Sequence, residues 1–111
     1  MKANESERLA QWKHQIEIAV LEAGRPKAPL ADVAIKVSVL FLLVRPLKPK
    51  AAVPIVAPDV DKLQRQIGDV LQGIYYANDS QIVDWSASKR YGQPGAHIVI
   101  TALDEQIEID I

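Results

Sequence analysis

Residues 58–73 read PDVDKLQRQIGDVLQG, and this stretch combines a start signal, an apolar face and a stop signal for one helix. Its apolar residues recur at helical spacing, which predicts a helix from Asp61, as N-cap, to about Gly73. The face opposite them is polar and contains Asp61, Arg65, Asp69 and Gln72. The stretch therefore predicts an amphipathic helix with two aspartates, Asp59 and Asp61, at its beginning.

The segments before this helix predict a second helix and a buried strand. A helix is expected from Asn4 to Gly24, where Gly24-Arg25-Pro26 is a typical stop. Residues 34–44 are almost continuously apolar, which favours a strand buried on both faces and central in its sheet. Residues 45–58 hold four prolines and predict an irregular loop, whose length makes it a candidate functional segment.

The segments after the helix predict a sheet. Residues 75–80 form a turn, with Asn78-Asp79 typical of turn chemistry. Alternation predicts a strand over residues 81–89, a hairpin-like turn over 91–95 and a returning strand over 96–103. The acidic tail, 104–111, either adds an edge strand or remains loose. The expected fold is α+β, a small mixed sheet with helices packed on it, with residues 1–111 as a single domain.

Composition excludes several classes. The chain has 111 residues and a formal net charge of −1. It contains no cysteine, and this excludes disulfides and thiolate metal sites. The most apolar run, residues 37–44, is far shorter than the roughly 20 residues of a membrane-spanning helix. The sequence also lacks a P-loop, a dinucleotide fingerprint and a nucleophile elbow.

Asp59 and Asp61 lie two residues apart, so in an extended segment their carboxylates share one side. Hard cations such as Mg²⁺ take oxygen ligands, and a helix N-terminus favours ionised carboxylates. The alternative is structural: Asp61 caps the helix and Asp59 is a solvated loop residue. Asp79 shares this ambiguity, since the turn after the helix must travel back along it to meet the other two.

The order and spacing of three segments resemble the RusA family of Holliday junction resolvases, especially its phage and prophage members. The segments are Pro58-Asp59-Val60-Asp61-Lys62-Leu63 with Arg65, Asp69 and Gly73, then Asn78-Asp79-Ser80-Gln81, then Ser88-Lys89-x-Tyr91-Gly92. The resemblance implies a homodimeric, Mg²⁺-dependent endonuclease that resolves four-way DNA junctions by paired nicks in recombination and repair. It also implies a phage- or prophage-encoded protein acting in the cytoplasm of a bacterial host.

By position, Asp59, Asp61 and Asp79 match the family's metal-binding catalytic carboxylates. Arg65 stands where the family has a catalytic lysine. The residues expected to bind DNA are Lys48, Lys50, Lys62, Lys89 and Arg90, with Arg45 as a further cation.

The chain departs from the family pattern at its start, where members have an extra strand before the first helix, so the expected fold lacks that strand. Asn78 replaces a frequent aspartate, which removes one ligand charge. A degenerate, non-catalytic DNA-binding or interaction module of the same fold is therefore the alternative function.

Overall fold

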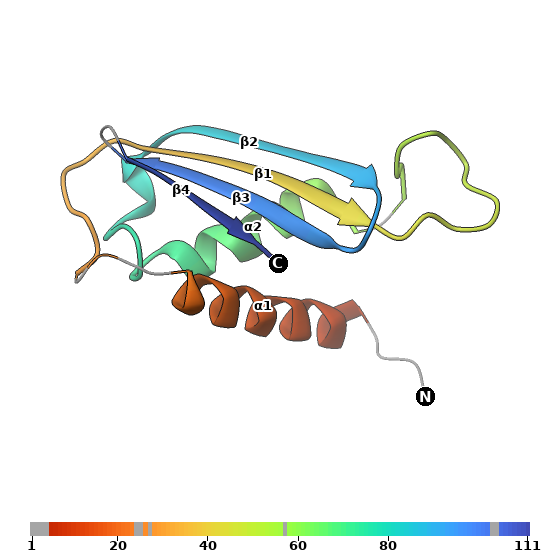
Figure 1. Ribbon diagram of the computed structural model, residues 1–111, viewed down its shortest axis with the longest axis horizontal. Helices are drawn as coiled ribbons and strands as arrows, with labels where there is room; N and C mark the ends of the chain where they lie inside the picture. The colour runs from red at the N-terminus through yellow and green to blue at the C-terminus, as the bar shows by residue number, and fades with distance from the viewer. Residues whose placement is uncertain (1–4, 24–25, 27, 57, 103–104) are drawn as a thin grey trace.

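The structure is a computed structural model that describes residues 5–23, 26, 28–56, 58–102 and 105–111. In chain order its elements are α1 (Glu5–Glu22), β1 (Ile35–Leu43), α2 (Val60–Leu71), the 3₁₀ helix η1 (Asp79–Gln81), β2 (Ile82–Tyr91), β3 (Gly95–Ala102) and β4 (Glu105–Asp110). The predicted α+β class is confirmed (Figure 1). Asn4, the predicted start of the first helix, lies outside the described residues.

The four strands form one mixed sheet in the order β2-β1-β3-β4. β1 pairs in parallel with β2 and antiparallel with β3, so its predicted central position is confirmed. β4 pairs antiparallel with β3, and the tail therefore adds an edge strand. The predicted hairpin is wrong: β2 and β3 run in opposite directions but lie on either side of β1, because residues 92–94 cross the end of that strand.

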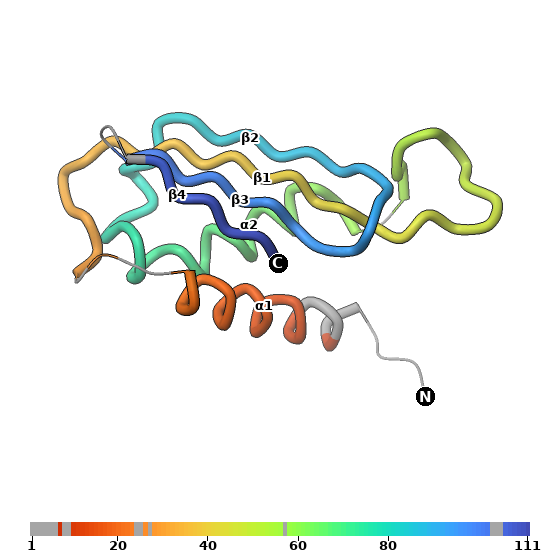
Figure 2. The backbone as a smooth tube through the Cα atoms, in the orientation of Figure 1, coloured from red at the N-terminus to blue at the C-terminus, as the bar shows by residue number. Residues whose placement is uncertain are grey.

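Only one face of the sheet is covered by helices among the described residues. α1 and α2 both pack beneath it, as the ribbon and the backbone tube show (Figures 1 and 2). In β1, Ile35, Val37 and Val39 are buried while the alternate residues Lys36 and Ser38 are exposed. The expectation of a strand buried on both faces is wrong, because this part of the chain places no helix on the second face.

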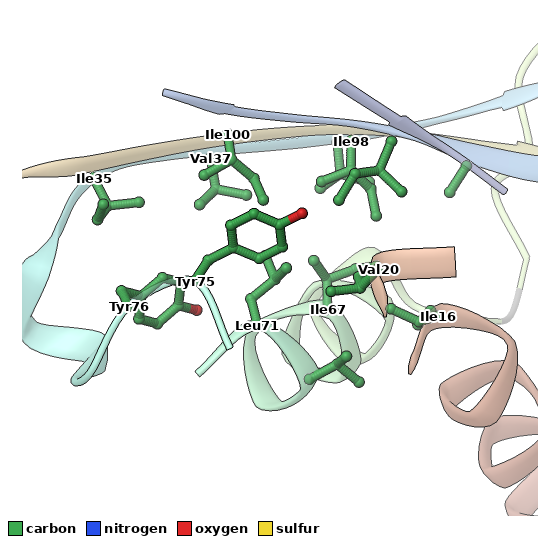
Figure 3. Close-up of a cluster of buried hydrophobic side chains, with 14 of the residues drawn as sticks. Ile16, Val20, Ile35, Val37, Ile67, Leu71, Tyr75, Tyr76, Ile98 and Ile100 are labelled. Carbon is green, nitrogen blue, oxygen red and sulfur yellow. The ribbon is translucent and has the colours of Figure 1, made fainter. Parts of the chain in front are cut away.

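The core lies between this covered face and the two helices (Figure 3). The predicted apolar face of α2 is confirmed, since its residues Leu63, Ile67, Val70 and Leu71 are all buried. Tyr75 and Tyr76, which follow α2, are also fully buried and close the core at that end. Burying apolar side chains is the main favourable contribution to folding, so these contacts fix where α2 lies under the sheet.

α2 runs antiparallel to β2 along the covered face (Figure 1). The two elements pack together at Gly68, where a Cβ atom would lie in ordinary van der Waals contact, 3.8 Å from Cζ2 of Trp85. α2 ends before Gly73, which takes the left-handed conformation (φ 87°) that favours glycine after a helix. Among the described residues, no helix is long and apolar enough to cross a membrane.

Candidate active-site groove

A groove of about 410 Å³ runs between α2 and the start of β2. Its lining comes from three elements: Asp61, Gln64, Arg65, Gly68 and Asp69 of α2, Asp79 of η1, and Ile82 and Trp85 of β2. Helical spacing places the α2 residues on one stripe, because they lie three, four, seven and eight positions after Asp61. The groove therefore gathers three of the predicted catalytic residues, Asp61, Arg65 and Asp79.

Asp59 lies at the helix start and outside the groove lining. It is exposed and occupies the N-cap position of α2, but its side chain makes no capping hydrogen bond. The prediction that Asp61 is the N-cap is wrong by two residues, since Asp61 lies in the first turn. Its carboxylate is thereby available to the groove.

Asp79 lies near the opposite end of α2. The Gln72 amide, oriented to donate, hydrogen-bonds Asp79 Oδ1 at 2.7 Å and Oδ2 at 2.9 Å. Gln72 follows the last residue of α2, and the ten helical steps from Asp61 to Leu71 rise roughly 15 Å. The turn after α2 thus does not travel back along the helix.

A capping box holds that turn in place. Asn78 Oδ1 accepts from the Ser80 N–H at 2.9 Å, while Gln81 Oε1 accepts from the Asn78 N–H at 2.9 Å. Gln81 Nε2 also donates to the carbonyls of Leu30 and Val33. Asn78 therefore serves the turn, and its spacing to Gln81 is a capping signal that sequence reasoning missed.

Asp69 is a groove residue that sequence reasoning placed on the polar stripe without assigning it a role. Asp69 and Asp79 both line the groove, and both carboxylates act on the hydroxyl of Tyr76. Burial of that phenol, and then the charges of Asp79 and Asp69, raise the pKa of Tyr76 well above its ordinary value. The Tyr76 hydroxyl stays protonated and donates to the Gly68 carbonyl at 3.2 Å.

The three aspartates predicted to bind one metal ion are divided between the two ends of α2. Within the described part of the chain, no group of three His, Cys, Asp or Glu side chains lies close enough to hold a metal ion. A three-carboxylate site within one chain therefore does not fit the residues present. The metal roles of Asp59, Asp61 and Asp79 remain predictions.

The predicted DNA-binding cations lie in four places. Lys48 and Lys50 are exposed on the loop between β1 and α2, and Lys62 is exposed in the first turn of α2. Arg90 is exposed on the open face of the sheet. Lys89 points to the covered face, where its ammonium donates to the carbonyls of Val56 at 2.9 Å and Pro58 at 3.0 Å.

Comparison with known proteins gives a family match. A family model described as "Endodeoxyribonuclease RusA" matches residues 2–101, which is most of the chain. No curated protein and no solved structure matches it.

Proposed function

The chain belongs to the RusA endodeoxyribonuclease family, and from this premise we propose that it is a structure-selective nuclease that resolves four-way DNA junctions. The observation that carries the proposal is the groove, which Arg65 lines together with Asp61, Asp69 and Asp79. A permanently charged guanidinium is suited to bind a DNA phosphate and to hold it beside the carboxylates of the groove.

Residues in and beside the groove have these proposed roles. Arg65 grips the scissile phosphate and stabilises the charge that develops on it during attack by water. Asp61 and Asp79 are the catalytic carboxylates, and Asp59 contributes a further negative charge beside Asp61. Gln72 positions Asp79, since its amide reaches both carboxylate oxygens.

Mg²⁺ is the proposed cofactor and a second copy of the chain the proposed partner. Mg²⁺ is commonly bound by one or two carboxylates together with waters and substrate phosphate, so it does not require three ligands from one chain. When bound, Mg²⁺ lowers the pKa of a water ligand and neutralises phosphate charge. The donors proposed for it are Asp59 and Asp61 of one copy together with Asp79 of the other, since the three do not converge within the described part of one chain.

The test is cleavage of a synthetic four-way junction labelled on each strand in turn. Symmetrical nicks are expected with Mg²⁺ and none with a chelator. Asp61→Asn and Asp79→Asn should each lower the nicking rate by about a hundredfold or more while junction binding persists. Asp84→Asn is the matched control, because Asp84 is an exposed aspartate of β2 that pairs with Lys36 outside the groove.

One observation favours a second function, a non-catalytic junction-binding module: the described residues gather no set of three metal-ligating side chains. Tight junction binding without nicking in Mg²⁺ or Mn²⁺ would establish this alternative and overturn the nuclease. Full activity of Asp61→Asn and Asp79→Asn would instead remove the groove assignment.

A further inference from the structure

The loop between β1 and α2 extends beyond the end of the sheet (Figure 1). The loop exposes large apolar side chains: Leu47 is 100% exposed and Ile55 62%, and Val44, Val53 and Val56 are exposed as well. Apolar surface concentrated in this way usually marks a site that another molecule covers. The groove and its carboxylates do not account for this surface.

The loop is held firmly at both ends. The Gly92 N–H donates to the Leu43 carbonyl at 2.9 Å where the loop leaves β1. At its other end, where the loop leads into α2, the Lys89 ammonium donates to the carbonyls of Val56 and Pro58. Pro54 is buried, and Pro46 and Pro49 flank the exposed Leu47. Prolines restrict the unbound chain, so little conformational entropy is lost when such a loop binds.

The charge of the loop indicates what covers it. Residues 44–58 include Arg45, Lys48 and Lys50 and no acidic residue, although the whole chain carries a net charge of −1. All three cations are exposed. Cations beside apolar side chains match a polyanion with apolar surfaces between its charges, which describes the phosphates and stacked bases of DNA.

We propose that residues 44–56 form a wedge that inserts Leu47 between base pairs at the branch point of a DNA junction, while Arg45, Lys48 and Lys50 bind the flanking phosphates. This inference rests on the proposed junction-directed function, because it gives that function its means of selecting a branched substrate. Apolar wedges must unstack the DNA base steps between which they insert, which costs free energy. At a branch point the stacking is already interrupted, so insertion there is favoured over insertion into duplex DNA.

The wedge leads along the chain directly into the groove. Asp59 and Asp61 come immediately after the Pro58 carbonyl that Lys89 holds. A branch point opened by Leu47 would thus present its backbone near the beginning of α2. This arrangement links the recognition of the branch to the nearest proposed catalytic carboxylates.

The experiment measures base unstacking without requiring cleavage. A four-way junction carries 2-aminopurine beside the branch point and is titrated with the full chain in a chelator, where unstacking appears as increased fluorescence. The wild-type protein should raise the fluorescence several-fold, and Leu47→Ser should abolish the increase while retaining most of the junction affinity. Val83→Ser is the matched control, because Val83 is 69% exposed on β2, away from the loop.

The cations are tested separately through salt dependence. Lys48→Gln with Lys50→Gln should weaken binding and reduce the slope of log affinity against log salt concentration by about 1.8, or about 0.9 for each lost phosphate contact. An unchanged slope would overturn the assignment of the loop lysines to phosphates.

The remaining outcomes separate the wedge from the nuclease. Junction binding by the wild-type protein without a fluorescence increase overturns the wedge and leaves the nuclease standing. A fluorescence increase without nicking in Mg²⁺ overturns the nuclease and supports the wedge. A change of oligomeric mass in Leu47→Ser, measured by light scattering, would show that a second copy covers the loop and would overturn the wedge.

Discussion

Two adjacent basic residues, Lys89 and Arg90, have different surroundings because successive residues of a strand face opposite sides. Arg90 lies exposed on the open face of the sheet, whereas Lys89 reaches under it to two backbone carbonyls. Sequence reasoning treated both as phosphate-binding residues. Alternation along β2 could have separated them, but the carbonyl partners of Lys89, 31 and 33 residues away, could not be predicted.

Lys89→Met tests whether this lysine positions the start of α2. Methionine keeps the apolar stem but removes two charge-assisted hydrogen bonds, so the free energy of unfolding in urea should fall by about 1–3 kcal/mol. Amide hydrogen exchange should increase in residues 58–61, and nicking should decrease.

Lys89→Arg should restore part of the loss, because guanidinium also donates to carbonyls. Arg90→Met is the control on the opposite face and should leave stability unchanged. Wild-type exchange rates at residues 58–61 in Lys89→Met would contradict a positioning role.

His97 makes the stability depend on pH. Its ring pairs with the Asp110 carboxylate across β3 and β4, and this hydrogen bond, with the charges of Asp110 and Glu108, raises the pKa of His97 despite some opposing burial. A histidine whose pKa is raised on folding stabilises the fold fully below its unfolded pKa of about 6.5. That contribution is lost as the pH rises through the folded pKa.

The expected outcome is a small decrease in stability between about pH 6 and pH 9, since the Asp110 side chain is largely exposed and the His97 side chain partly so. His97→Gln should remove this part of the pH dependence, whereas His14→Gln on α1 should keep it. Urea denaturation at both pH values measures the effect, and equal pH dependence in wild type and His97→Gln would refute it.

At the scale of elements, helices were predicted better than strand pairing. The apolar stripes of the helices follow from local spacing, and their residues Ile16, Val20 and Ile67 are buried. The sheet was harder, because the turn at residues 91–95 reverses the chain but does not determine which strand lies beside it. Likewise Leu40 and Leu42 suggested burial on both faces, yet burial depends on a second layer that sequence alone does not reveal.

Gly95 is the residue that lets β4 approach the start of β3. An alanine Cβ there would lie 2.1 Å from the Ile111 carbonyl oxygen, and that oxygen accepts from the Ala96 N–H at 3.1 Å. Backbone atoms cannot yield as a flexible side chain does. Gly95→Ala should therefore lower the free energy of unfolding by about 2 kcal/mol or more.

Gly73→Ala is the comparison, because Gly73 also has positive φ but no neighbouring atom lies within 4 Å of the place its Cβ would take. Gly73→Ala should lower the free energy of unfolding only by the cost of a left-handed backbone conformation, about 1–2 kcal/mol. Thermal or urea unfolding of both variants tests whether Gly95→Ala is less stable than Gly73→Ala. Equal stability of Gly95→Ala and wild type would show that the end of β4 does not need this contact.

At the scale of the whole molecule, the antiparallel course of α2 and β2 decides where the acidic residues lie. Asp59 and Asp61 lie at one end of α2, and Asp79 precedes the start of β2 at the other. The spacing of the motif in sequence indicated the family, and the family match supports it. The separation of the carboxylates could not be predicted, because it depends on whether residues 74–79 return along the helix.

This separation yields a prediction about two copies of the chain. Asp61 and the Gln72 side chain that holds Asp79 are divided by roughly 15 Å along α2. In a two-fold symmetric dimer the same surfaces meet with opposite polarity, so the beginning of one α2 can lie beside the end of the other. We therefore expect each active site of the proposed homodimer to combine Asp61 of one copy with Asp79 of the other.

Mixing two inactive variants tests this expectation. A heterodimer of Asp61→Asn with Asp79→Asn would keep one complete site, containing Asp61 from one copy and Asp79 from the other, and one site lacking both. Nicking of one junction strand should reappear on mixing, while each variant alone stays inactive. Sites assembled within single chains would leave both sites damaged, so a mixture as inactive as its components would show that the separation of roughly 15 Å is closed by movement within one chain.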